Sequence, residues 1–186
     1  MRLPKPRIAP LSDAELSDEQ KVALAPMGAR IINIFRTLAH APKALTRFQQ
    51  WGAYVLSRRN SLPEREREIA ILRTGYLCKS GYEWTQHVII GKRSGLSDDE
   101  IARIKKGADA GWSAPDAALI RASDELHKDQ FISDATWAAL GKHLTQKQCM
   151  DVVFTAGQYT QVSMFLNSFG VQLDEGQTLD PDLKGF

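Results

Sequence analysis

The sequence predicts an all-α protein with a single domain. Apolar residues recur at helical spacing through almost every segment, and no stretch alternates apolar and polar residues for long enough to predict a strand. Proline, serine and glycine also stand where helices begin and end. With 186 residues, of which 43% are hydrophobic, the chain fits one domain (1–186) with a substantial core.

The first part of the chain predicts an arm followed by two helices. The arm, about residues 1–11, contains three prolines and is expected to be extended. A short helix is expected over residues 12–24, because Pro26 stops it. Pro42 then starts an amphipathic helix that is expected to end at Asn60.

The middle of the chain predicts two consecutive helices, over about residues 63–78 and 81–93. A Ser-Gly pair at positions 80 and 81 separates them, so they are expected to form a hairpin. Ser97 and Glu100 have the spacing of a capping box and predict the start of the next helix.

The last third predicts a central helix and an irregular tail. Pro115 opens a helix that reaches about residue 128, and Ser133 caps a short one. The longest helical pattern covers residues 145–169 and is expected to be central and buried. The C-terminal tail, about 171–186, loses this periodicity and is expected on the surface or against a neighbouring subunit.

Composition argues against several classes of function. The net charge is only +2, and no run of like charges predicts nucleic-acid binding. No apolar stretch approaches the roughly 20 residues of a membrane span, and no signal peptide is expected. The two cysteines, Cys78 and Cys149, lack a partner motif, which suits a reducing compartment and predicts a cytoplasmic protein.

Three ionisable residues are the candidates for chemistry. A helix turns by about 100° per residue, which places Glu68 in the middle of the apolar arc of its helix. The same calculation places Glu83 and His87, four residues apart, on the apolar side of the next helix. In a hairpin these groups are expected to converge in a dry pocket, where they divide naturally into a proton acceptor and a proton donor.

Plainer interpretations remain open at this point. A Glu-x-x-x-His pair is often an ordinary surface pair, and an arginine such as Arg36, Arg73 or Arg121 is a candidate partner for the buried glutamate. Two carboxylates and one imidazole also suit a metal ion, but the spacing is not that of a known zinc motif, so no metal is expected. No phosphate loop, nucleophile elbow or dinucleotide motif predicts a cofactor.

Several stretches resemble the carboxymuconolactone decarboxylase family. They are EREIAILR at 66–73, YEWTQH at 82–87 and GLS at 95–97. NIFRTLAHAP at 33–42 and QYTQVSMFLN at 158–167 look like its longer, AhpD-sized members. The resemblance implies an AhpD-like helical domain that assembles as a trimer or hexamer.

The resemblance also separates two chemistries. AhpD-type members have a glutamate, a Cys-x-x-Cys pair, and a histidine four residues after the second cysteine. Here Glu68 and His87 fall at the glutamate and histidine positions, while Ser80 and Glu83 stand at the cysteine positions, so a disulfide cycle is not expected. The lactone decarboxylases instead have a glutamate four residues before the histidine, as this chain does.

The resemblance therefore implies a cofactor-independent lyase, decarboxylase-like, that acts on a small organic acid or lactone. His87 is assigned as general acid/base, Glu83 orients it or shares its proton, and Glu68 is a second acid/base; Ser80 and Tyr82 are the expected substrate contacts. Three alternatives stay open: an AhpD-like peroxide-reducing antioxidant protein that works through a single thiol, a non-catalytic oligomeric binding protein, and a metal-dependent enzyme.

Overall fold

The computed structural model describes residues 1–185, which contain nine α-helices and no strand and so confirm the predicted all-α class. The helices are α1 (Asp18–Leu24), α2 (Asn33–Leu38), α3 (Pro42–Val55), α4 (Glu64–Leu77), α5 (Gly81–Arg93), α6 (Asp98–Lys106), α7 (Ala114–Asp129), α8 (Asp134–Gly141) and α9 (Gln146–Phe169). None of these described helices has the length and apolar character needed to cross a lipid bilayer.

Side-chain capping explains where most helices begin. The predicted capping box at Ser97 is present, and its hydroxyl accepts a hydrogen bond from the Glu100 backbone. The expected single helix over residues 12–24 is wrong, because Ser17 forms a capping box of its own and starts α1 there. The residues before it form a separate 3-10 turn, Asp13–Glu15.

Two other helix boundaries differ from the expectation. The helix that starts at Pro42 ends at Val55 rather than at Asn60, and residues 57–60 form turns instead. The short helix α2 has no side-chain cap at its first residue, so the sequence carried no clear signal for it.

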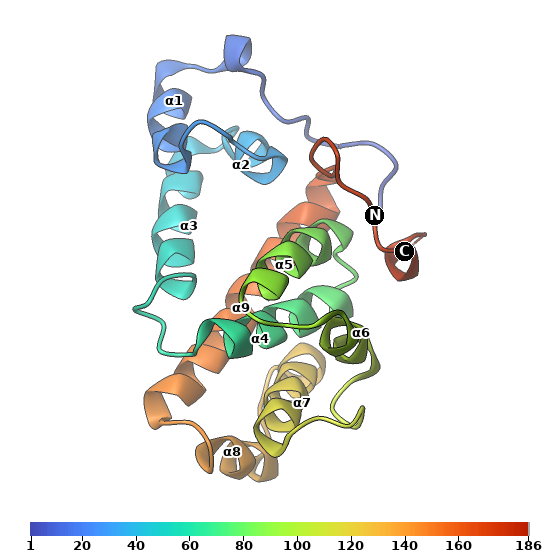
Figure 1. Cartoon of the computed structure of the whole chain (residues 1–186). Coiled ribbons are helices and arrows are strands. Elements are labelled where there is room, and N and C mark those ends of the chain that lie inside the picture. Colours follow the sequence, from blue (N-terminus) through green and yellow to red (C-terminus); the bar gives the residue numbers. More distant parts are fainter. Residues whose placement is uncertain (186) are drawn as a thin grey trace.

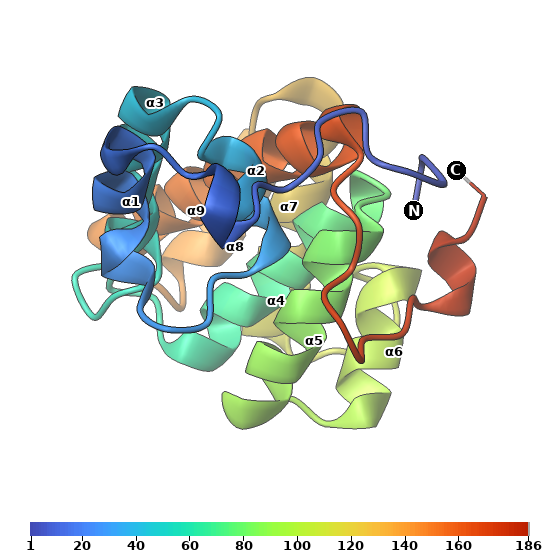
Figure 2. The same ribbon diagram turned by 90° about the horizontal axis from the view of Figure 1, so that it is seen from above.

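The long helix α9 is central, as predicted, and the other helices pack around it (Figure 1). Helix α4 lies against α9 and is itself covered by α5 on one side and by α7 on the other. This position leaves α4 with buried residues all round, including Arg67 and Arg73 as well as its apolar side chains. Helices α1 to α3 form a separate group that packs on α9 through α3 (Figures 1 and 2).

The C-terminal tail packs on its own chain, across α5 and α6 (Figure 2). The Tyr82 hydroxyl donates to Asp174 at 2.7 Å, and the Trp84 indole donates to Asp180 at 3.0 Å. Leu183 is buried, and its carbonyl oxygen accepts a hydrogen bond from the Met1 ammonium at 2.8 Å. Isolated polar anchors hold the tail, which is why hydrophobic periodicity did not predict its course. The final residue of the tail lies outside the described part of the chain.

A glycine allows helices α4 and α5 to approach closely. A Cβ atom added to Gly75 would lie 3.2 Å from Glu83 Cγ, which is tighter than most contacts of this kind. This contact holds the backbone of α4 against the first turn of α5. Gly157, exposed in α9, has no neighbour within 4 Å of the same added atom.

We expect Gly75→Ala to destabilise the protein and Gly157→Ala to stabilise it. The first crowds Glu83 and should cost about 1–3 kcal/mol, as overpacking usually does. The second replaces glycine in an exposed helix and should gain about 0.5–1 kcal/mol. Urea unfolding of both variants measures the difference, and equal stabilisation by the two alanines would show that the helices do not meet at Gly75.

Candidate acid–base site

The hairpin of α4 and α5 brings the three predicted ionisable side chains into one chain of hydrogen bonds. His87 Nδ1 lies 2.7 Å from Glu68 Oε2, and His87 Nε2 lies 3.0 Å from Glu83 Oε1. The exposed fractions of Glu68, Glu83 and His87 are 0%, 4% and 5%. Their expected convergence in a buried place is therefore confirmed, while their catalytic roles remain predictions.

None of the arginines considered as partners for Glu68 reaches it. Each of the three instead pairs with an aspartate: Arg36 with Asp13, Arg73 with Asp124 and Arg121 with Asp109. Glu68 Oε1 has no hydrogen-bond partner among the described residues, so the imidazole is the group that compensates this buried carboxylate.

The two carboxylates favour the protonated form of His87. Burial alone would lower the pKa of this imidazole, but the charges and hydrogen bonds of Glu68 and Glu83 outweigh burial and raise it to about 10. A doubly protonated ring donates from both nitrogens, as two flanking carboxylates require. The edge of the Tyr159 ring packs against the imidazole, with centroids 4.8 Å apart and an interplanar angle of 83°. Burial raises the pKa of the Tyr159 phenol well above 10, so it stays neutral.

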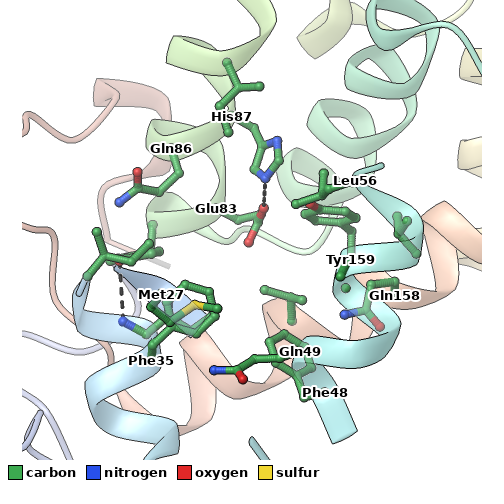
Figure 3. Close-up of a pocket in the computed structure, with 18 residues that line it drawn as sticks. Met27, Phe35, Phe48, Gln49, Leu56, Glu83, Gln86, His87, Gln158 and Tyr159 are labelled. Carbon is green, nitrogen blue, oxygen red and sulfur yellow. Dashed lines mark hydrogen bonds and ion pairs between the residues drawn. The ribbon is translucent and has the colours of Figure 1, made fainter. Parts of the chain in front are cut away.

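The pair Glu83 and His87 forms one wall of a cavity of about 330 Å³ (Figure 3). Most of the remaining wall is apolar and comes from α2, α3, α5 and α9. Glu68 lies behind His87 and does not line the cavity. A bound molecule would therefore meet Glu83 and His87 directly and Glu68 only through the imidazole.

The two expected substrate contacts lie in different places. Tyr82 lines the cavity, although its hydroxyl is engaged by Asp174, and burial raises the pKa of this phenol. Ser80 is fully buried at the N-cap of α5 and does not line the cavity. Its hydroxyl has no partner within residues 1–185.

Four further polar residues of the cavity wall were not singled out from the sequence: Gln49, Gln86, Gln158 and Tyr159. Gln158 and Tyr159 begin the QYTQVSMFLN stretch, so the family resemblance was a signal that could have found them. Gln86 was available from the YEWTQH stretch in the same way. Gln49 had no such signal, because it stands on a helix whose packing partner is distant in sequence.

The cysteines lie apart from this wall. Both are free thiols, and neither lines the cavity. Cys78 Sγ lies 3.7 Å from His127 Nδ1, and burial raises the pKa of this thiol. Because the thiolate is the reactive form, this environment does not activate Cys78. Cys149 is buried in the main hydrophobic core.

Solved structures define the class of protein. The alkylhydroperoxidase AhpD core protein from Ralstonia eutropha JMP134, an uncharacterized peroxidase-related protein, is similar with a TM-score of 0.79 and 18% identity, over 93% of this chain and 94% of that chain. The debrominase Bmp8 in complex with 2,3,4-tribromopyrrole is similar with a TM-score of 0.71 and 9% identity, over 90% and 91%. An uncharacterized peroxidase-related protein from Silicibacter sp. TM1040 gives 0.70 and 13%, over 99% and 94%. The fold is AhpD-like.

The family follows from the sequence match. The model of the carboxymuconolactone decarboxylase family matches residues 42–124, which run from the start of α3 into α7 and contain Glu68, Glu83 and His87. The chain belongs to this family, as the resemblance implied. No curated protein sequence matches the chain.

We expect His87 to remain cationic at neutral pH and to stabilise the fold in that form. Its pKa is raised above the unfolded value of about 6.5, so the stabilisation is complete below pH 6.5 and is lost as the pH rises toward 10. Nitrogen NMR of labelled imidazoles should show both His87 nitrogens protonated at pH 7.5. The difference in unfolding free energy between wild type and His87→Gln should shrink by up to a few kcal/mol between pH 6.5 and 10. A single protonated nitrogen at pH 7.5 would contradict this assignment.

Proposed function

We propose that this protein is a cofactor-independent acid–base enzyme of the lyase type that acts on a small organic acid or lactone. The observation that carries the proposal is the buried Glu68–His87–Glu83 chain, which opens at one end into an apolar cavity. Ionisable groups with perturbed pKa values in a cavity are a signature of catalytic sites. The small ring compound held by the debrominase Bmp8 is consistent with a small-molecule substrate.

The geometry supports a division of labour among the three groups. Glu83 is the basic group that meets a ligand, so it accepts a proton from a substrate carbon beside a carbonyl, and the C–H electron pair moves into the carbonyl to form an enolate. The cationic His87 stabilises the negative charge that develops nearby. Glu68 is a positioning residue in this scheme, because it acts on the substrate only through His87.

The same groups can complete a decarboxylation. When a carboxylate leaves as carbon dioxide, the electron pair of the broken C–C bond stays on the substrate carbon, and a proton must then reach that carbon. The Glu83–His87 pair shares a proton and faces the cavity, so it is the source of that proton. Tyr82 is the more suitable of the two expected substrate contacts, since Ser80 lies outside the cavity wall.

The test is an assay in heavy water with a panel of small lactones and organic acids. Deuterium uptake beside the carbonyl, or loss of carbon dioxide, is read by proton NMR. We expect Glu83→Gln and His87→Ala to lower the rate by about 10²–10⁴-fold, because each removes a proton-transfer group. We expect the double Cys78→Ser, Cys149→Ser variant to keep the wild-type rate.

Other outcomes of this assay would support the alternatives. Peroxide consumption that needs an external thiol and is lost in Cys78→Ser would establish a single-thiol antioxidant activity. Activity that tracks bound metal in elemental analysis would establish a metal-dependent enzyme. Binding of panel members with no turnover would indicate a binding protein.

We also propose a cytoplasmic homo-oligomer, a trimer or hexamer. The free thiols support the location. Exposed apolar side chains support the assembly, because single soluble chains rarely leave large apolar patches uncovered. Those exposed in one chain are Val22, Trp51, Leu56, Ile89, Ile90, Phe131, Trp137, Met150 and Met164.

We expect light scattering at micromolar concentration to give three or six times the chain mass of 20.7 kDa. Replacing an exposed apolar residue of the interface by glutamate should shift the mass downward, because a buried charge without a partner destabilises an interface. Trp51→Glu and Phe131→Glu sample two different faces. A wild-type mass near 20.7 kDa would rule out the assembly.

A further inference from the structure

The charges of the cavity wall discriminate between the two proposed substrate classes. Within residues 1–185 the wall contains no lysine or arginine, and its charged members are Glu83 and His87. With Glu68 behind the imidazole, the three groups carry two negative charges and one positive charge when His87 is protonated. The Arg67 guanidinium lies outside the wall. An entering carboxylate would lose its hydration and meet excess negative charge, with a cation already paired on both sides.

Two uncharged amides face this acid–base pair across the cavity. Gln49 on α3 and Gln158 on α9 lie opposite Glu83 and His87 in Figure 3. The Gln49 Nε2 atom is buried and has no acceptor among the described residues. Gln158 is 5% exposed, and its side chain makes no hydrogen bond within the same part of the chain. Buried N–H groups without an acceptor are rare and unfavourable, so an acceptor in the cavity would stabilise them.

The rest of the wall suits an aliphatic or ring-shaped body. Its apolar side chains include Ile34, Phe35, Phe48, Val55 and Val162. A volume of about 330 Å³ falls at the small end of ligand cavities, which suits a molecule of roughly ten heavy atoms. The polar contacts are therefore confined to two opposite places on an apolar surface.

We propose that the substrate is a neutral, largely apolar carbonyl compound, a lactone rather than an organic acid, and that Gln49 determines this specificity. The amide N–H of Gln49 donates to the carbonyl oxygen, which directs the neighbouring carbon toward Glu83 across the cavity. Gln158 supplies the second amide at the same end. This inference deepens the proposed function and rests on it for the direction of proton transfer, but the binding preference is measured separately.

The test compares two probes with the same carbon skeleton: γ-octalactone, which is neutral, and 4-hydroxyoctanoate, its ring-opened anion. Binding to the full-length protein at pH 7 is measured by NMR titration. We expect the lactone to bind at least tenfold more tightly than the hydroxy acid. Glu83→Gln should narrow this ratio, because it removes one negative charge from the wall.

Gln49→Leu should weaken lactone binding by about five- to tenfold, the usual effect of one lost hydrogen bond to a neutral group. The matched control is Gln50→Leu, on the exposed side of the same helix, which should leave binding unchanged. Gln158→Leu provides a second cavity variant if the first fails to fold. Equal affinity of the Gln49→Leu and Gln50→Leu proteins would refute the role of Gln49.

The outcomes separate this inference from the proposed function. Tight lactone binding without turnover of any compound would uphold the substrate class and overturn the enzymatic proposal. Equal or tighter binding of the hydroxy acid would overturn the substrate class, whichever compounds are turned over. Failure of the lactone to bind at millimolar concentration would overturn it as well.

Discussion

The buried chain of charges Glu68–His87–Glu83 is the interaction on which the arrangement of the molecule depends. A carboxylate with no exposed surface is tolerated only when a partner of opposite charge lies within hydrogen-bond distance. His87 is that partner for two carboxylates at once, so helices α4 and α5 must keep one register relative to each other. The close contact at Gly75 and the layers of α7 and α9 around α4 hold that register.

The same chain of charges determines what the cavity can do. Burial strengthens electrostatic interactions, so the imidazolium stays protonated well above neutral pH and offers a fixed positive charge beside a basic carboxylate. An apolar cavity then limits the substrate to molecules that bring little charge of their own. Stability and specificity thus come from one set of residues, and a change in any of the three alters both.

Residues placed by local geometry were predictable, and residues placed by long-range packing were not. Helical periodicity placed Glu68, Glu83 and His87 on facing sides of a hairpin, because two adjacent helices with a tight break leave few ways to pack. Gln49 reaches the cavity only because α3 packs on α9, and no pattern in the sequence states that pairing. The tail escaped prediction for a related reason, since single contacts such as Trp84 to Asp180 hold it.

Position 83 separates the chemistry of this chain from that of its redox-active relatives. Its carboxylate lies 3.0 Å from His87 Nε2, so a cysteine at the same position would place a thiol beside a cationic imidazole, which lowers a thiol pKa and activates it. A disulfide cycle would need a second sulfur at position 80, where this chain has a buried serine. Glutamate at position 83 keeps the imidazole and its second carboxylate in use but transfers protons instead of electrons. The hairpin therefore supports either chemistry, and the residues at positions 80 and 83 determine which one.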